Sequence, residues 1–209
     1  MKRSIHRENN WIFPFVAYEP EGMTRKLPLV IQLHGAGERG EGGEDLDLVE
    51  VWGFPGMAKT GEYPCMFVFP QCPKDTFWAA RVESILKFID QLMEHYDIDT
   101  DRIYLTGLSM GGYGTWYTAM AAPDRFAAIA PVCGGGMAWN AGVLTMPVWA
   151  FHGAEDKSVS VFSSDEMVER MQNCGLNVRY TRLEGVGHNV WLNAYNDELL
   201  NWLLSHKKE

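Results

Sequence analysis

The sequence lacks any hydrophobic run long enough to span a membrane, and it lacks net positive charge. No stretch approaches the roughly 18 consecutive apolar residues of a transmembrane helix, so we expect no membrane partner. The formal net charge is −9. An acidic surface repels phosphate backbones, which argues against nucleic acid as a partner.

Cysteine is also scarce, with four residues that show no metal-ligand spacing. No CxxC pair or Cys/His cluster occurs, so we expect neither a metal site nor a cofactor. Cys65 and Cys72 flank the run MFVFPQ, which as a strand holds them about 20 Å apart, too far for a disulfide. We expect Cys65, Cys72, Cys133 and Cys174 to be free thiols, buried or half-buried, as in a reducing compartment.

The N-terminal stretch starts basic but has no apolar segment behind it. A secretory signal needs such a segment. We therefore expect no signal peptide and a cytoplasmic location.

Apolar residues make up 46% and charged residues 22% of the chain, enough to bury a core. The length suits one domain over residues 1–209. Short apolar runs alternate with helical patterns, which predicts a mostly parallel sheet with helices on both faces. The link between the first two strands is too short for a crossover helix and predicts an antiparallel start. Strands are expected at 13–18, 29–33, 66–69, 103–106, 127–132, 148–151 and 178–183, and helices at about 79–96, after 109, at 164–174 and at 190–205.

The stretch GLSMGG, residues 107–112, surrounds one serine with glycines where a strand should meet a helix. It matches the nucleophile elbow G-x-S-x-G. Such a turn strains the serine backbone and leaves no room for neighbouring side chains, which Gly107 and Gly111 provide. Ser109 would then present its hydroxyl at the top of the sheet, with the Met110 N–H aimed at a developing oxyanion.

A plain glycine-rich turn is the alternative reading, and partners for Ser109 decide between the two. The elbow requires an acid and then a histidine, in that order. Asp156 follows the strand that starts at Val148, and His188 follows the strand that starts at Val178. We predict that His188 takes the proton of Ser109 and that Asp156 orients His188.

Other acids and histidines fit less well. Asp124 lies at the end of the helix after the elbow, and Glu155 is adjacent to Asp156 but should point differently. His206 lies in the charged tail. We expect the remaining histidines to be structural, although two of them, His34 and His152, lie near the rim: His6, His34, His95 and His152.

The loop after the strand at 29–33 is glycine-rich, as the second oxyanion donor requires. We assign that donor to the backbone N–H of Ala36. Glu38 and Arg39 are expected to pair and brace this loop. A phosphate cradle is the alternative, but the sequence has no GxxxxGK[ST] and no GxGxxG with a following acidic residue.

The segments LHGAGERG, FVFPQCPKDTFW, GLSMGGYGTW, FHGAEDKSV and GVGHNVW, in this order, resemble the α/β-hydrolase superfamily. Within it they are similar to small bacterial carboxylesterases of the phospholipase/carboxylesterase, dienelactone-hydrolase and feruloyl-esterase-like groups. The resemblance implies an α/β-hydrolase fold, with Ser109, Asp156 and His188 as triad and Ala36 and Met110 as backbone donors. Strict dienelactone hydrolases use a cysteine nucleophile, and the serine here argues against that activity.

Only a short segment separates APVCGGG from TMPVWAF, so we expect no cap domain, and any lid must come from 37–58. An open rim favours an apolar pocket. Four side chains fall on or near the predicted rim loops as candidate substrate contacts: Trp78, Met137, Trp139 and Trp191.

These features predict a serine hydrolase that cleaves small or polysaccharide-linked carboxylic esters with short acyl, aryl, acetyl or feruloyl groups. Thioesterase or serine peptidase activity on the same triad is the alternative, because acyl transfer uses the same oxyanion hole. A non-catalytic receptor or scaffold of this fold is a third reading, which the intact ordered triad disfavours.

Overall fold

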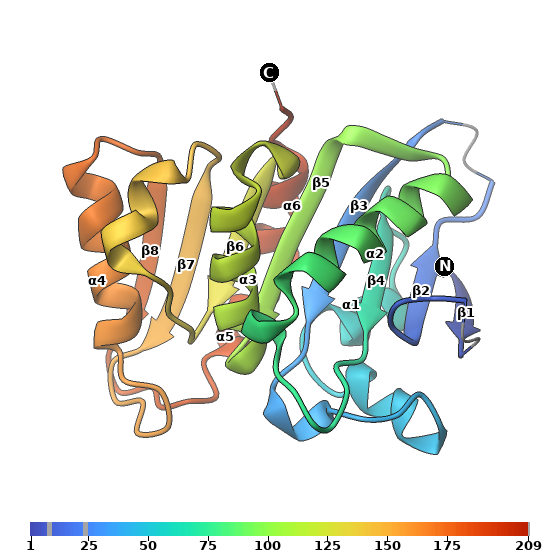
Figure 1. Cartoon of the computed structure of the whole chain (residues 1–209), viewed down its shortest axis with the longest axis horizontal. Coiled ribbons are helices and arrows are strands. Elements are labelled where there is room, and N and C mark those ends of the chain that lie inside the picture. Colours follow the sequence, from blue (N-terminus) through green and yellow to red (C-terminus); the bar gives the residue numbers. More distant parts are fainter. Residues whose placement is uncertain (8–9, 23–24, 209) are drawn as a thin grey trace.

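The computed structural model describes residues 1–7, 10–22 and 25–208 and contains one eight-stranded sheet (Figure 1). The strand order is β1-β2-β4-β3-β5-β6-β7-β8. The strands are β1 (Lys2–His6), β2 (Phe15–Glu19), β3 (Leu27–Leu33), β4 (Met66–Pro70), β5 (Ile98–Leu108), β6 (Ala128–Val132), β7 (Val148–Gly153) and β8 (Val178–Leu183). The helices are α1 (Phe54–Thr60), α2 (Val82–His95), α3 (Met110–Ala121), α4 (Phe162–Asn173), α5 (Trp191–Ala194) and α6 (Asp197–Leu204).

The sheet is parallel except at its start, which confirms the predicted antiparallel beginning. β2 runs antiparallel to both β1 and β4, while β4, β3, β5, β6, β7 and β8 pair in parallel. β2 does not pair with β3, the next strand in the chain, because β4 lies between them. β1 was not predicted, since its sequence KRSIH is mostly polar and sits half-exposed at the edge.

Helices cover both faces of the sheet, which explains why its central strands are continuously apolar. In Figure 1, α2, α3 and α4 lie in front and α1 and α6 lie behind. The front layer buries Ile89, Trp116 and Met167 against one face. The rear layer buries Phe54 and Leu199 against the other.

The edge strand β1 is tied to the rear layer through the buried carboxylate of Glu50. Glu50 accepts hydrogen bonds from the Arg3 guanidinium and the Tyr18 hydroxyl, and Lys59 Nζ lies 3.7 Å away. Burial alone would raise the pKa of Glu50, but these partners outweigh it and hold the pKa below its ordinary value.

The segment after β3 carries two 3₁₀ turns, Ala36–Glu38 and Glu44–Glu50, before α1. Two buried amides fasten this segment to the sheet. Gln32 accepts from the Phe54 N–H and donates to the Trp52 carbonyl. Gln71 accepts from the Gly42 N–H and donates to the carbonyls of Glu38 and Asp45.

The connection between β6 and β7 contains a single 3₁₀ turn, Ala138–Val143, so no cap domain is inserted there. Among the described residues, no helix combines the length and apolarity needed to cross a bilayer. All four cysteines are free thiols, as expected, and Cys65, Cys72 and Cys133 are buried, but the expected burial of Cys174 is wrong. Cys174 is the C-cap residue of α4, directly before the positive-φ Gly175, and is exposed.

Candidate active site

Ser109 lies between β5 and α3 in a strained backbone conformation. Its φ is 53° and its ψ is −115°, a region that side-chain-bearing residues rarely adopt. The flanking glycines are required by close approach: a Cβ on Gly107 would lie 2.3 Å from the Gly111 carbonyl oxygen. A Cβ on Gly111 would lie 2.0 Å from the Leu33 carbonyl oxygen. The glycines therefore make a fixed turn that displays one hydroxyl.

The structure brings the three predicted triad side chains into one hydrogen-bonded chain. His188 Nε2 lies 2.9 Å from Ser109 Oγ, and His188 Nδ1 lies 2.6 Å from Asp156 Oδ2. Because a carboxylate only accepts, Nδ1 carries the proton and Nε2 accepts from the serine hydroxyl. This is the tautomer that a general base opposite a serine needs.

The carboxylate of Asp156 is held by several donors. Its side chain has no exposed surface, and its Oδ1 accepts the backbone N–H groups of Ser158 and Val159 at 2.8 and 2.9 Å. Burial alone would raise the pKa of Asp156, but the hydrogen bonds from His188, Val159 and Ser158 outweigh it and keep the pKa below its ordinary value. Asp156 is therefore ionised at neutral pH.

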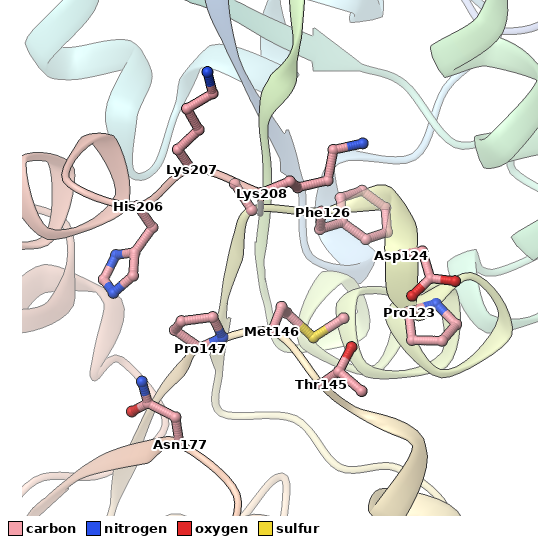
Figure 2. Close-up of a pocket in the computed structure, with 11 residues that line it drawn as sticks. Pro123, Asp124, Phe126, Thr145, Met146, Pro147, Asn177, His206, Lys207 and Lys208 are labelled. Carbon is pink, nitrogen blue, oxygen red and sulfur yellow. The ribbon is translucent and has the colours of Figure 1, made fainter.

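The rival residues lie elsewhere. Glu155 is exposed beside Asp156. Asp124 and His206 line a separate cavity of about 630 Å³, shown in Figure 2. That cavity is also lined by Ala127, Pro147 and Asn177, which directly precede β6, β7 and β8. It therefore lies at the amino ends of the parallel strands, whereas Ser109 lies at their carboxyl ends.

The two predicted oxyanion donors lie at helix starts beside the elbow. Met110 is the first residue of α3, and Ala36 is the first residue of the 3₁₀ turn after β3. The first N–H groups of a helix have no partner within it, which leaves them for a ligand. The loop is close to the elbow, since a Cβ on Gly35 would lie 3.0 Å from a side-chain methyl of Leu108.

The loop carrying Ala36 is fixed by His34 and Arg39. His34 Nε2 accepts from the Cys72 N–H at 2.9 Å, and burial lowers the pKa of His34 to about 4, so the ring is neutral. Arg39 braces the loop, but not through Glu38 as expected. Its guanidinium donates to the backbone carbonyls of Ala36, Lys74 and Thr76.

An apolar pocket of about 410 Å³ opens beside Ser109. α3 contributes Met110, Tyr113 and Tyr117, which follow Ser109 on one helix face. The sequence contained this signal in the i, i+4, i+8 spacing of Ser109, Tyr113 and Tyr117. The remaining lining residues come from two loops, and no pattern in the sequence indicated them: Phe77, Ala79 and Val159.

None of the four predicted pocket residues is among those that line the cavity beside Ser109, although Trp191 contacts His188. Trp78 is wholly buried in the core, and its indole N–H donates to the His34 carbonyl at 3.0 Å. Met137 packs against the core of the front layer. Trp139 is 76% exposed on the turn between β6 and β7. None of the three lines the cavity beside Ser109.

Trp191 does lie beside the triad. Its ring meets the His188 ring edge-on, with centroids 5.2 Å apart. Trp52 belongs to the segment 37–58, and its ring centroid lies 6.0 Å from that of Trp191. The segment considered as a lid thus reaches the rim next to His188.

Cys133 lies under the triad. Its sulfur and the ligand-type atoms of Asp156 and His188 all lie within 4.8 Å of one another, a grouping not seen in the sequence. Burial raises the pKa of Cys133 to about 12, so the thiol is protonated. Asp156 and His188 already bond each other, and a protonated thiol is a weak metal ligand. The grouping is therefore best described as packing beneath the triad.

The fold and the hydrogen-bonded Ser109, His188 and Asp156 define an α/β-hydrolase with a serine–histidine–aspartate arrangement. The chain belongs to the phospholipase/carboxylesterase family, whose model matches residues 77–198.

Relatives and solved structures agree with this family. A solved thermostable esterase is 32% identical, covers 99% of this chain and superposes with a TM-score of 0.83. The bifunctional acetylxylan esterase/xylanase XynS20E of Neocallimastix patriciarum is 31% identical over 65% of this chain. The poly(3-hydroxyalkanoate) depolymerase C of Paucimonas lemoignei is 31% identical over 56% of this chain. This chain spans 63% of the solved esterase and only 20% and 30% of the two curated relatives.

Proposed function

We propose that this protein is a serine esterase that works through an acyl-enzyme on Ser109. The observation that carries the proposal is the chain Ser109–His188–Asp156, with contacts of 2.9 and 2.6 Å, on a strained turn beside an apolar pocket. A strained serine backbone persists only where surrounding structure maintains it, and such strain concentrates at functional sites.

In the proposed reaction, Ser109 Oγ attacks the ester carbonyl carbon while His188 Nε2 takes the hydroxyl proton. The backbone N–H groups of Ala36 and Met110 stabilise the oxyanion of the tetrahedral intermediate. The C–O bond to the leaving alcohol then breaks, and His188 returns the proton to that alcohol. Water repeats the sequence on the acyl-enzyme and releases the acid and free Ser109.

The substrate class follows from the pocket beside Ser109. Its lining is largely apolar and aromatic, and it is partly open, which suits one short acyl, alkyl or aryl substituent rather than a long buried chain. Relatives named as a bifunctional acetylxylan esterase/xylanase and as a poly(3-hydroxyalkanoate) depolymerase support an ester bond, small or polymer-linked, as the target.

The test compares the parent protein with Ser109→Ala on p-nitrophenyl acetate and butyrate. We expect hydrolysis by the parent and background rates for the variant, with circular dichroism showing that both are folded. Turnover retained in Ser109→Ala would refute the mechanism. Acyl-CoA thioesters and peptide amides assayed alongside distinguish the thioesterase and peptidase alternatives, which predict faster acyl transfer from those substrates than from the esters.

A further inference from the structure

A second histidine, His152, contacts the carboxylate that orients His188. His152 lies on β7 and has no exposed surface. Its Nε2 lies 3.3 Å from Asp156 Oδ2 and 3.1 Å from the Val159 carbonyl oxygen. Asp156 Oδ2 is therefore shared between two imidazole rings.

The other nitrogen of the His152 ring is anchored to α4. Nδ1 lies 2.7 Å from the hydroxyl oxygen of Ser164, which is 1% exposed. The Ser164 oxygen in turn lies 2.8 Å from the Gly134 carbonyl oxygen. One buried imidazole thus joins β7, α4 and the loop after β6, and this fixes the ring edge that faces Asp156.

The neighbours of His152 determine where its proton sits. The two groups facing Nε2, the Val159 carbonyl and the Asp156 carboxylate, only accept, so a bare Nε2 lone pair would repel both. Nδ1 faces the Ser164 hydroxyl, whose single proton goes either to Nδ1 or to the Gly134 carbonyl. Giving that proton to Nδ1 leaves one carbonyl contact unmade, whereas a bare Nε2 would face two acceptors, one of them charged. Burial lowers the pKa of His152, opposed by the Val159 carbonyl and by the charges of Asp156 and Asp165. The ring is therefore neutral at pH 7, with its proton on Nε2.

We propose that His152 is a positioning residue for the site, acting by sharing its Nε2–H between the Val159 carbonyl and Asp156 Oδ2. This inference rests on the proposed function and deepens it. Two backbone amides bond Oδ1, the His188 ring bonds Oδ2, and His152 Nε2 lies 3.3 Å from Oδ2. Without the Nε2–H, one of the two contacts that hold Oδ2 is lost, and the carboxylate can rotate away from His188.

Two amide substitutions distinguish the contacts of His152 Nε2 from those of His152 Nδ1. His152→Gln places its amide nitrogen as many bonds from Cα as the imidazole Nε2, so it can still donate to Asp156. His152→Asn places its amide group at the distance of Nδ1, so it can bond Ser164 but cannot reach Asp156. Both are neutral amides that leave some of the ring volume empty, which makes each the control for the other. Ser164→Ala removes the Nδ1 anchor together with the Ser164 contact to the Gly134 carbonyl, and leaves both Nε2 contacts in place.

The readouts are kcat and KM on p-nitrophenyl butyrate and the strongly deshielded ¹H NMR resonance of the His188 Nδ1–H. We expect His152→Gln to retain kcat within about threefold and to keep the resonance. We expect His152→Asn to lower kcat about tenfold or more at similar KM, because a buried bond to a charged group is lost, and to broaden or remove the resonance. Ser164→Ala should stay close to the parent protein in both.

Equal losses in the Gln and Asn variants, or a loss in Ser164→Ala as large as in His152→Asn, would show that the ring only supports the fold and would overturn the proposal. The resonance does not depend on turnover. A parent protein inactive on every ester, with the resonance kept in His152→Gln and lost in His152→Asn, would refute the proposed function while supporting the positioning role. An active parent whose resonance is the same in all variants would overturn the positioning role alone.

Discussion

Narrowing the pocket beside Ser109 should change which esters the protein cleaves. Ala79 lines this pocket at a half-buried position, so Ala79→Leu should fill it without disturbing the core. Burying one methylene is worth about 0.8 kcal/mol, or about fourfold in kcat/KM for complete burial. From a C2 to a C4 substituent the parent protein should therefore gain up to about fifteenfold. Ala79→Leu should remove most of this gain.

The assay uses two series, p-nitrophenyl esters of increasing acyl length and acetate esters of increasing alcohol length. The pocket accommodates either the acyl or the alcohol group of the ester, so kcat/KM should rise with chain length in only one series. In that series, Ala79→Leu should make kcat/KM nearly independent of chain length. Ala80→Leu is the matched control, because Ala80 is the next residue and is exposed. The reasoning is refuted if neither series rises with length, or if Ala79→Leu and Ala80→Leu change it equally.

Three further predictions follow from the described contacts. Asp156→Asn should lower kcat about a thousandfold or more by reversing the histidine tautomer, while Glu155→Gln stays near parent activity, measured on p-nitrophenyl butyrate. Gly111→Ala should cost at least about 3 kcal/mol of unfolding free energy because its Cβ meets backbone at 2.0 Å, whereas Gly37→Ala has open space and should cost far less, measured by urea denaturation. The pKa of Glu50 is below its ordinary value in the folded protein, so its stabilisation is present above its unfolded pKa of about 4.3 and is lost as pH falls through the folded pKa. Glu50→Gln should therefore lower the melting temperature at neutral pH. The melting temperature of this variant should also decrease less than that of the parent protein when the pH is lowered below about 4.

The sheet and the triad were predictable because both follow from local patterns. Seven of the eight strands were predicted, most of them because fully covered strands are apolar throughout. Parallel strands place their carboxyl ends at one edge, so residues following three of them were expected to converge. The structure confirms that Ser109, Asp156 and His188 meet there. Their catalytic roles stay predictions until the variants are measured.

The pocket was less predictable because it depends on side-chain direction and on contacts between distant segments. Phe77 and Trp78 are adjacent, and only the backbone shows that Phe77 faces outward near Ser109 while Trp78 enters the core. The contact between His152 and Ser164 joins a strand to a later helix, and neither residue type indicates the other. Such pairings become visible only when the fold is known.

The most direct test of the central claim is covalent labelling by a fluorophosphonate, followed by peptide mass spectrometry. We predict one adduct per chain, on Ser109, which forms rapidly in the parent protein, is absent in Ser109→Ala and forms much more slowly in Asp156→Asn. Failure of the folded parent protein to label, or an adduct on any other residue, would contradict the claim that Ser109 is an activated nucleophile.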